Sequence, residues 1–370
     1  MDAHDTRAFL LASAALIAAL GLGAEAESWK DQTVLVSRQG EQTVVRSFDG
    51  AKVLFQSSDA QLALEWAMAH AWNTLVLAGK YVVADSVEVP RDGVTLVIAP
   101  GAEISLDPNT EHKTDIGFRS PRHPGFWKIV PLIYNRGHDN VRVIHLGKLF
   151  HFVRTDERHG EQTFPIVFDG RNERRTCGVE GGMLVVAGSI EQTCLVLDAR
   201  RVEVPLVAVQ AGLDAVLCLE GCEECKLGMI ANLAAKPGGQ TGETVDLNSS
   251  NRRITIERLV GERPQEMIDS NASGVVVNEM VSVGRPRKFL CFTVGSGPRW
   301  TSRPRAADRI DVLEAAVLEE PAEVSLKIAA PRLPDDLPRL TIEATIEITM
   351  KNGARKTYAK RVGIDLASGT

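Results

Sequence analysis

The sequence predicts an all-β protein: a right-handed, single-stranded parallel β-helix with an N-terminal capping helix and a small C-terminal antiparallel β-sheet. Three observations lead to this prediction. Short apolar segments recur along the chain, and an acid or Asn and then a turn follow each of them. A single helical pattern precedes most of these segments, and an unbroken apolar–polar alternation follows them. Together these features are typical of a coil of stacked strands with a different element at each end.

The N-terminal segment has the features of an export signal. Residues 8–24 form an apolar stretch, and Ala24-Glu25-Ala26 matches the small-residue pattern of a cleavage site. The preceding residues carry two acids and one Arg where a positive charge is usual, so an uncleaved anchor or a later start residue stays open. We expect residues 1–26 to be a signal peptide, no membrane span after its removal, and a secreted or periplasmic protein.

One helix is expected after three short strand-like runs at 33–37, 43–47 and 52–56. Ser58-Asp59-Ala60-Gln61 is a capping-box pattern, and apolar residues then recur at helical spacing to about Ala71. Such a helix could cover the open end of a stack of strands, whose edges would otherwise be unpaired.

Residues 74–106 contain three β-branched runs separated by glycine and proline turns. This stretch resembles the first coils of the pectate-lyase-like β-helix superfamily. The matching residues are Gly79, Tyr81, Val87, Val89, Pro90, Gly93, Val94, Thr95, Leu96, Gly101 and Ala102. The resemblance implies the fold, including its handedness, and says little about activity.

Between residues 165 and 284 the chain repeats one plan of two apolar strands with an acid or Asn between them. The best pair of repeats aligns Glu243 with Glu266 and Asp246 with Asp269, an offset of 23 residues. Units of this kind cannot bury their faces alone, so they stack. We expect the β-helix to span residues 27–300.

The last part of the chain, residues 301–370, begins with a Pro/Arg-rich connector and has no such repeat. Residues 340–350 alternate strictly, Asn352-Gly353 is a hairpin signal, and 355–364 and 324–328 supply further strands. We expect a small antiparallel sheet that either caps the last coil or forms a separate module.

The composition excludes some partners. The formal net charge is −6, and each basic cluster lies beside acids. A nucleic-acid-binding protein needs a basic surface to neutralise phosphates, so we expect no nucleic-acid partner. The number of subunits is left open.

The six cysteines fit an oxidising compartment, where they would form disulfides or remain buried thiols. A second interpretation is a zinc–thiolate site built from Cys218, Cys222 and Cys225 with Cys291.

Aligning the repeats predicts which strand residues point out of the coil. We expect Leu195 and Leu197 to point inward with Ile166, Phe168, Leu217, Leu219, Val245, Leu247, Ile268 and Ser270. The outward partners then form one column of acids along a face. The candidate catalytic residues are Asp169, Asp198, Glu220, Asp246 and Asp269.

This column has three interpretations. Paired carboxylates could do acid–base chemistry on a polysaccharide. Their oxygens could hold Ca²⁺, which bridges protein and acidic sugar in β-helix lyases. Alternatively, Asp and Asn could end each strand and bond turn amides as a structural ladder; Asp169-Gly170 looks like this case. No other cofactor is expected.

Candidate substrate-binding residues come from turns and loops. Arg200, Lys226 and Arg253 follow the acid-bearing strands, although turn placement also fits simple solvent exposure. Two long insertions, 107–129 and 149–165, bring His123, Trp127 and His151, residues that suit an anionic sugar. An ordinary solvated loop is the alternative.

Two functions follow from these patterns. The first is an exported carbohydrate-active protein, a lyase or glycoside hydrolase acting on or binding an acidic polysaccharide. The second is a non-catalytic exported β-helix with a surface-binding or structural role. Polygalacturonase-like enzymes carry Asp-Asp, Gly-His-Gly and Arg-x-Lys motifs that the predicted coil lacks, and aromatic residues are only 5% of the chain. These departures favour the second function.

Overall fold

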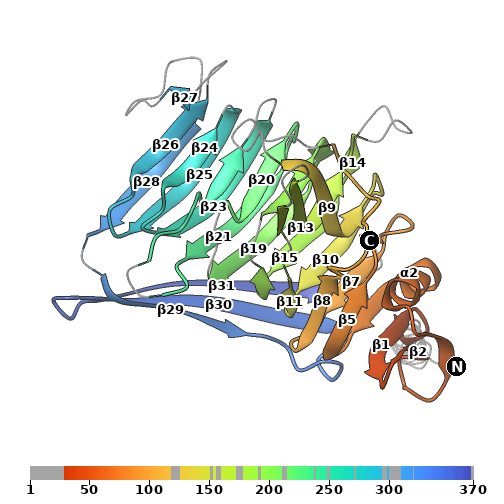
Figure 1. Cartoon of the computed structure of the whole chain (residues 1–370). Helices are drawn as coiled ribbons and strands as arrows, with labels where there is room; N and C mark the ends of the chain where they lie inside the picture. The colour runs from red at the N-terminus through yellow and green to blue at the C-terminus, as the bar shows by residue number, and fades with distance from the viewer. Residues whose placement is uncertain are drawn as a thin grey trace, which may run out of the picture.

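The computed structural model describes residues 29–117, 126–150, 153–155, 160–171, 178–190, 193–210, 215–236, 239–247, 251–270, 272–293, 298–299, 310–319 and 321–367. In this part of the chain the fold is all-β, with one long helix and two large sheets of mainly parallel strands (Figure 1). It is consistent with the predicted β-helix class.

Most of the strands belong to three sheets, here named A, B and C. Sheet A has twelve strands: β1 Thr33–Gln39, β2 Gln42–Ser47, β3 Val53–Ser57, β4 Asn73–Val76, β7 Thr95–Ile98, β10 Arg142–His145, β15 Met183–Val186, β19 Glu203–Gln210, β21 Lys226–Leu233, β23 Arg252–Glu262, β25 Ser273–Val283 and β28 Ile310–Leu318. Sheet B has four: β5 Gly79–Val83, β8 Ala102–Leu106, β11 Lys148–Leu149 and β16 Ser189–Ile190.

Sheet C has ten strands, nine in its main order and one, β12, beside β13. They are β6 Val87–Glu88, β9 Phe126–Asn135, β12 Val153–Thr155, β13 Gly160–Asp169, β17 Cys194–Leu197, β20 Leu217–Glu220, β22 Val245–Leu247, β24 Glu266–Ser270, β26 Lys288–Thr293 and, antiparallel to β26, β27 Pro298–Arg299; β12 pairs antiparallel with β13. A two-stranded sheet, β14 Val179–Glu180 with β18 Ala199–Arg200, lies at the corner between sheets C and A.

The chain visits the sheets in turn, which produces the stack. From β4 to β17 each circuit contributes one strand to A, one to B and one to C, and the later circuits alternate between A and C in the described residues. Parallel neighbours in one sheet therefore come from successive circuits. The 23-residue offset is confirmed in sheet C, where Asp246 lies opposite Asp269, but in sheet A the offset is 21, with Ile256 opposite Val277.

The interior of the coil is apolar. Residues such as Val76, Ile98, Val186 and Ile230 are fully buried and belong to one continuous cluster. Alternate side chains of each strand enter this interior, as expected for strands that lie between two environments.

The predicted helix is confirmed as α2, Ala60–His70. Its N-cap is Asp59, whose carboxylate accepts a hydrogen bond from the Leu62 amide at 3.2 Å. The buried face of α2, which includes Leu64 and Met68, packs into the interior cluster beside β1, β2 and β3. The helix therefore covers the N-terminal end of the coil, as expected.

The three predicted tail strands are confirmed as an antiparallel sheet, the tail sheet: β29 Pro321–Ala329, β30 Arg339–Met350 and β31 Arg355–Asp365. We expected this sheet to cap the last coil or to stand apart. Instead, Ile342, Ile346 and Ile348 of β30 pack against outward side chains of sheet A such as Ile144 and Leu206.

Figure 1 shows the tail sheet running beneath the coil along its length. Its far end reaches the first circuits, where the side-chain amide of Asn73 donates to the Leu366 carbonyl at 3.3 Å. The expected boundary at residue 300 also precedes β28, which still belongs to sheet A through its parallel pairing with β25.

Residues 1–28, the expected signal peptide included, lie outside the described residues. Within the described ranges, no helix has the length and apolar character that crossing a bilayer would require.

Candidate functional site

The five candidate catalytic acids all come from sheet C or the turn that follows it, but they do not form one column. In one outward column, strand register places Cys218 opposite Asp246, and Asp246 opposite Asp269. In a second column, Asp169 lies opposite Leu197, and Leu197 opposite Glu220. The acids therefore form two groups on adjoining circuits, the first ending at β20 and the second beginning at β22.

The predicted single column was wrong because Asp169 and Glu220 lie two residues beyond the register position of Asp246 and Asp269, and because the side chains of strand β17 have the opposite orientation to the one expected. We expected Leu195 and Leu197 to point inward, but both lie in an outer apolar cluster with Val167 and Cys218. Cys194 and Val196 point into the interior instead. A shift of one residue in register moves every side chain of a strand to the opposite face. Asp198 consequently follows the end of β17 rather than lying within the column.

Asp169 is the most heavily bonded of the five acids. Its Oδ1 accepts hydrogen bonds from the backbone amide and from Nε of Arg171, each at 3.0 Å. Its Oδ2 accepts from Nη2 of Arg171 at 3.0 Å and from the Tyr134 hydroxyl at 3.2 Å. Because Asp169 is only 6% exposed and both oxygens are used, this carboxylate acts as a positioning and turn-closing group. Asp169 thus bonds a turn amide, as the ladder interpretation expects, although its register neighbour is Leu197 rather than another acid.

Asp198 has an unusual backbone conformation. Its φ is +43°, in the left-handed region that glycine favours, and the register of β17 with β20 places it opposite Gly221, whose φ is +68°. A non-glycine residue held there carries strain of the kind that often marks a functional position.

The Asp198 side chain is held close to the chain of the next circuit. A Cβ placed on Gly221 would lie 2.0 Å from Asp198 Oδ1, so the carboxylate occupies the space that glycine leaves open. Partial burial raises the pKa of the Asp198 carboxyl; Arg171 opposes this shift and Asp169 adds to it. The direction of this pKa shift is the one that a general acid requires.

Glu220 lies beside Asp198 on the next circuit. The Asp198 amide donates to the Glu220 carbonyl at 2.8 Å, and the Glu220 side chain is partly exposed. Glu220 is also close enough to act electrostatically on the Arg171 guanidinium. Asp198, Glu220 and the Asp169–Arg171 pair thus form one cluster of three carboxyl groups and one cation, here called the Asp198 cluster.

The second group of acids begins on the next circuit, at β22. The Cys218 thiol donates to Asp246 Oδ2 at 3.7 Å, and Asp246 is partly exposed. Asp269 is the register neighbour of Asp246, but its side chain lies outside the described residues. Adjacent strands of a sheet are about 4.8 Å apart, so this pair extends the acidic surface along the coil axis.

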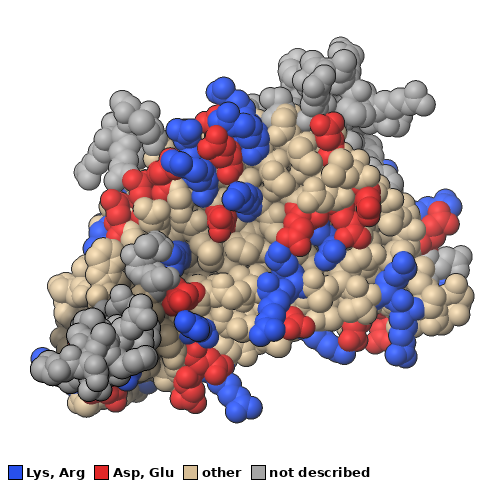
Figure 2. All heavy atoms as spheres, turned by 180° about the vertical axis from the view of Figure 1, so that it is seen from behind, with Lys and Arg blue, Asp and Glu red and all other residues tan. Residues whose placement is uncertain are grey.

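The three basic candidates lie at the corner between sheets C and A. Arg200 Nε is 3.2 Å from Glu223 Oε2, and Arg253 Nη2 is 2.8 Å from Glu224 Oε1. Both guanidinium groups are therefore held in ion pairs along the corner. Lys226 is exposed at the start of β21, opposite Glu203 of β19. Figure 2 shows acidic and basic side chains intermingled over one face of the molecule, rather than a continuous basic surface.

The two long insertions are only partly described. His123 and His151 lie outside the described residues, as does the side chain of Trp127 at the start of β9. The described part of the first insertion lies beside the Asp198 cluster: Ile116 joins the outer apolar cluster, and its carbonyl accepts from Nη2 of Arg171 at 2.8 Å. This contact ties the loop to the cluster.

The zinc interpretation of the cysteines is wrong for the described thiols. Cys218 points out of the coil, whereas Cys222 and Cys225 lie in its interior, so the three sulfur atoms do not converge. All three, together with Cys194, are buried free thiols. Across the described ranges, no three His, Cys, Asp or Glu side chains come together as a metal site, calcium included.

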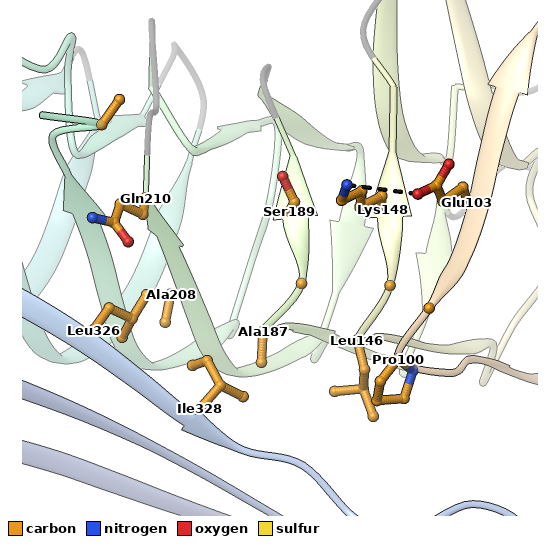
Figure 3. Close-up of a pocket in the computed structure, with 14 residues that line it drawn as sticks. Pro100, Glu103, Leu146, Lys148, Ala187, Ser189, Ala208, Gln210, Leu326 and Ile328 are labelled. Carbon is orange, nitrogen blue, oxygen red and sulfur yellow. Dashed lines mark ion pairs between the residues drawn. The ribbon is translucent and has the colours of Figure 1, made fainter. Parts of the chain in front are cut away.

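A groove lies on the opposite side of the coil, at the corner between sheets A and B, and no candidate acid lines it. It has a volume of about 560 Å³ and is bounded by Leu326 and Ile328 of the tail sheet on one side. Glu103, Lys148, Ser189 and Gln210 stand on the other side (Figure 3).

Sequence reasoning missed Tyr134 and Arg171. Arg171 was not among the candidate residues, but its guanidinium bonds Asp169 through two nitrogen atoms. The signal was the order Asp169-Gly170-Arg171, since a turn that an Asp closes can bring a side chain two residues later back onto the same carboxylate. Tyr134 comes from the preceding circuit, and only the register reveals it.

Comparison with known proteins adds little. No protein-family model matches the sequence, and no curated protein matches it. A solved structure from Parabacteroides merdae, described as a putative glycosyl hydrolase, is 11% identical; the match covers 70% of this chain and 87% of that chain, with a TM-score of 0.26. A similarity of that degree supports no argument about function.

Proposed function

We propose that the protein is an exported, right-handed parallel β-helix that cleaves a polysaccharide by acid–base chemistry at the Asp198 cluster. The single observation that carries this proposal is Asp198 itself. A carboxyl with a raised pKa occupies a glycine-like backbone position beside an Arg–Asp pair and a second, partly exposed carboxyl, Glu220.

The roles of the residues follow from their environments. Asp198 supplies the general acid, because its environment disfavours the charged form. Glu220, on the neighbouring circuit, supplies the second carboxylate that glycosidic cleavage uses as base or nucleophile. Arg171 and Tyr134 hold Asp169, and Asp169 in turn fixes Arg171 next to Asp198.

A polymeric substrate is favoured by the repetition of the face. Acids recur on successive circuits from Asp169 to Asp269, so an extended chain lying along the coil axis would contact several of them. An acidic sugar would meet these carboxylates directly, and the nearby Arg200 and Arg253 are already ion-paired.

The test is a screen of the purified protein on neutral and uronate polysaccharides, with Ca²⁺ and with EDTA. New reducing ends report hydrolysis, and absorbance of unsaturated products reports elimination. We expect turnover of at least one polymer, and a loss of about 100-fold or more in Asp198→Asn and Glu220→Gln. Lys356→Glu on β31, far from the cluster, is the control. No turnover on any polymer, or full activity in both variants, would overturn the proposal.

A non-catalytic role is the second candidate, favoured by Asp169. Both of its oxygens serve the fold, which is the behaviour of a ladder residue. If Asp198→Asn and Glu220→Gln lower the melting temperature as much as Asp169→Asn does, the whole cluster is structural.

A further inference from the structure

The groove between the coil and the tail sheet is lined by segments from five successive circuits. The floor consists of small residues at the corners between sheets A and B, among them Gly147, Ala187 and Ala208. No residue with a side chain fits at position 147 in this backbone, because its Cβ would lie 2.3 Å from the Ala102 carbonyl oxygen. Five circuits at about 4.8 Å span about 19 Å, the length of roughly six residues of extended chain.

One wall of the groove is a strand edge. β29 pairs with β30 on one side, and no described strand pairs with its other side. The backbone amides and carbonyls along such an edge can bond an added strand. Figure 1 shows β29 running along the coil axis, so an added strand would follow the groove.

The apolar face of β29 is incompletely covered. On β30, Ile342, Ile346 and Ile348 are at most 1% exposed, whereas Leu326 and Ile328 on β29 are only partly buried and line the groove. In Figure 3 both side chains project from β29 toward the coil, opposite Ala187 and Ala208. An added strand with apolar side chains on this face would complete their burial.

The opposite wall is polar and carries surplus positive charge. Lys80 and Lys148 share one carboxylate, with Nζ atoms 3.7 and 3.6 Å from Glu103. Both lysines are mostly exposed, with side chains 82% and 54% accessible. An acidic side chain on the occupant would be attracted to this wall.

We propose that this groove binds an extended peptide segment of another protein, with apolar side chains alternating with acidic ones, as an added strand on the free edge of β29. The inference is independent of the proposed function, since the groove and the Asp198 cluster lie on different sides of the coil and share no residue.

The probe is a labelled synthetic peptide with the sequence of residues 340–349, LTIEATIEIT, which alternates apolar residues with Thr and Glu. We expect saturable binding by fluorescence anisotropy, and hydrogen-exchange protection of amides in 321–329 but not in the other edge strand, β31. Ser189→Trp, which fills the groove from an exposed position, should weaken binding about tenfold or more, whereas Ala359→Trp on β31 should not.

Reversing the charges on the groove and on the peptide gives a more specific test. Lys148→Glu should weaken binding of the acidic peptide about tenfold and restore binding of the peptide in which both Glu are Lys. Lys356→Glu should change neither. No binding below about 1 mM, protection on β31, displacement by uronate oligosaccharides, or concentration-dependent self-association through the groove would each overturn the proposal.

Discussion

The outer faces of sheets A and C belong to the same coil but have opposite characters. Outward residues of sheet A, such as Leu75, Ile144 and Leu206, are apolar and buried under the tail sheet. Outward residues of sheet C include Tyr134, Asp169, Glu220 and Asp246, with apolar side chains between them. The outer face of sheet A therefore stabilises the fold, whereas the outer face of sheet C carries polar groups that could do chemistry.

Substitution of a residue that covers sheet A should destabilise the fold most. Ile346 of β30 is fully buried between the tail sheet and sheet A. Ile346→Asp would remove this apolar contact and place an uncompensated charge there, so the free energy of unfolding should fall by about 5 kcal/mol or more. Thr341→Asp, on the exposed side of the same strand, should cost less than about 1 kcal/mol. Chemical denaturation of both variants measures the difference; equal losses would mean that the tail sheet does not seal sheet A.

On the polar face, loss of the Asp169–Arg171 ion pair should lower the free energy of unfolding almost as much. Arg171→Ala leaves Asp169 buried without its cation, which should cost about 3–5 kcal/mol. The matched control is Arg285→Ala, which breaks an ion pair with Glu319 whose side chains are 77% and 58% exposed. That change should cost at most about 1 kcal/mol. Denaturant midpoints of the two variants would sharpen the comparison, and a loss for Arg171→Ala no larger than the control's would contradict it.

The interior between the two faces should respond to pH through His145. This residue is fully buried in the apolar column between Ile98 and Val186, and burial lowers the pKa of its imidazole to about 4, from 6.5. The unfolded chain then binds the proton first, so the stabilisation is complete above pH 6.5 and is lost as pH falls toward 4. The loss should be about 3 kcal/mol.

His145→Val, which matches its neighbours in the column, provides the control. Urea unfolding at pH 7 and at pH 4.5 should show a smaller acid loss in this variant than in the parent chain. The same loss in both would mean that other groups, such as the carboxylates of sheet C, dominate the acid response.

Much of this architecture could be predicted from local patterns. The helix after the Ser58–Gln61 pattern, the alternation over 340–350 and the repeat that pairs Asp246 with Asp269 depend on short-range spacing, and the structure confirms all three, with Asp59 rather than Ser58 as the N-cap. Register was predictable only where the repeats align without ambiguity. All four residues of β17 are apolar, so the sequence does not show which of them point into the coil. Leu195 and Leu197 were therefore assigned to the wrong face.

Contacts between distant segments could not be read from the sequence. Tyr134 of β9 reaches Asp169 at the end of β13 only because these strands of successive circuits pair. The position of the tail sheet did leave a signal. Strands such as β7, Thr95–Ile98, are buried on both faces, and a continuous apolar run indicates a strand covered on both sides.

We propose that Asp198 is held in place for chemistry rather than for folding. The most direct measurement is the activity and the melting temperature of Asp198→Gly on whichever polysaccharide the screen identifies. Glycine relieves the positive φ, so the variant should be equally stable or more stable, by up to about 1 kcal/mol, while turnover falls by about 100-fold or more. A variant that keeps its turnover, or that loses stability together with activity, would contradict the account.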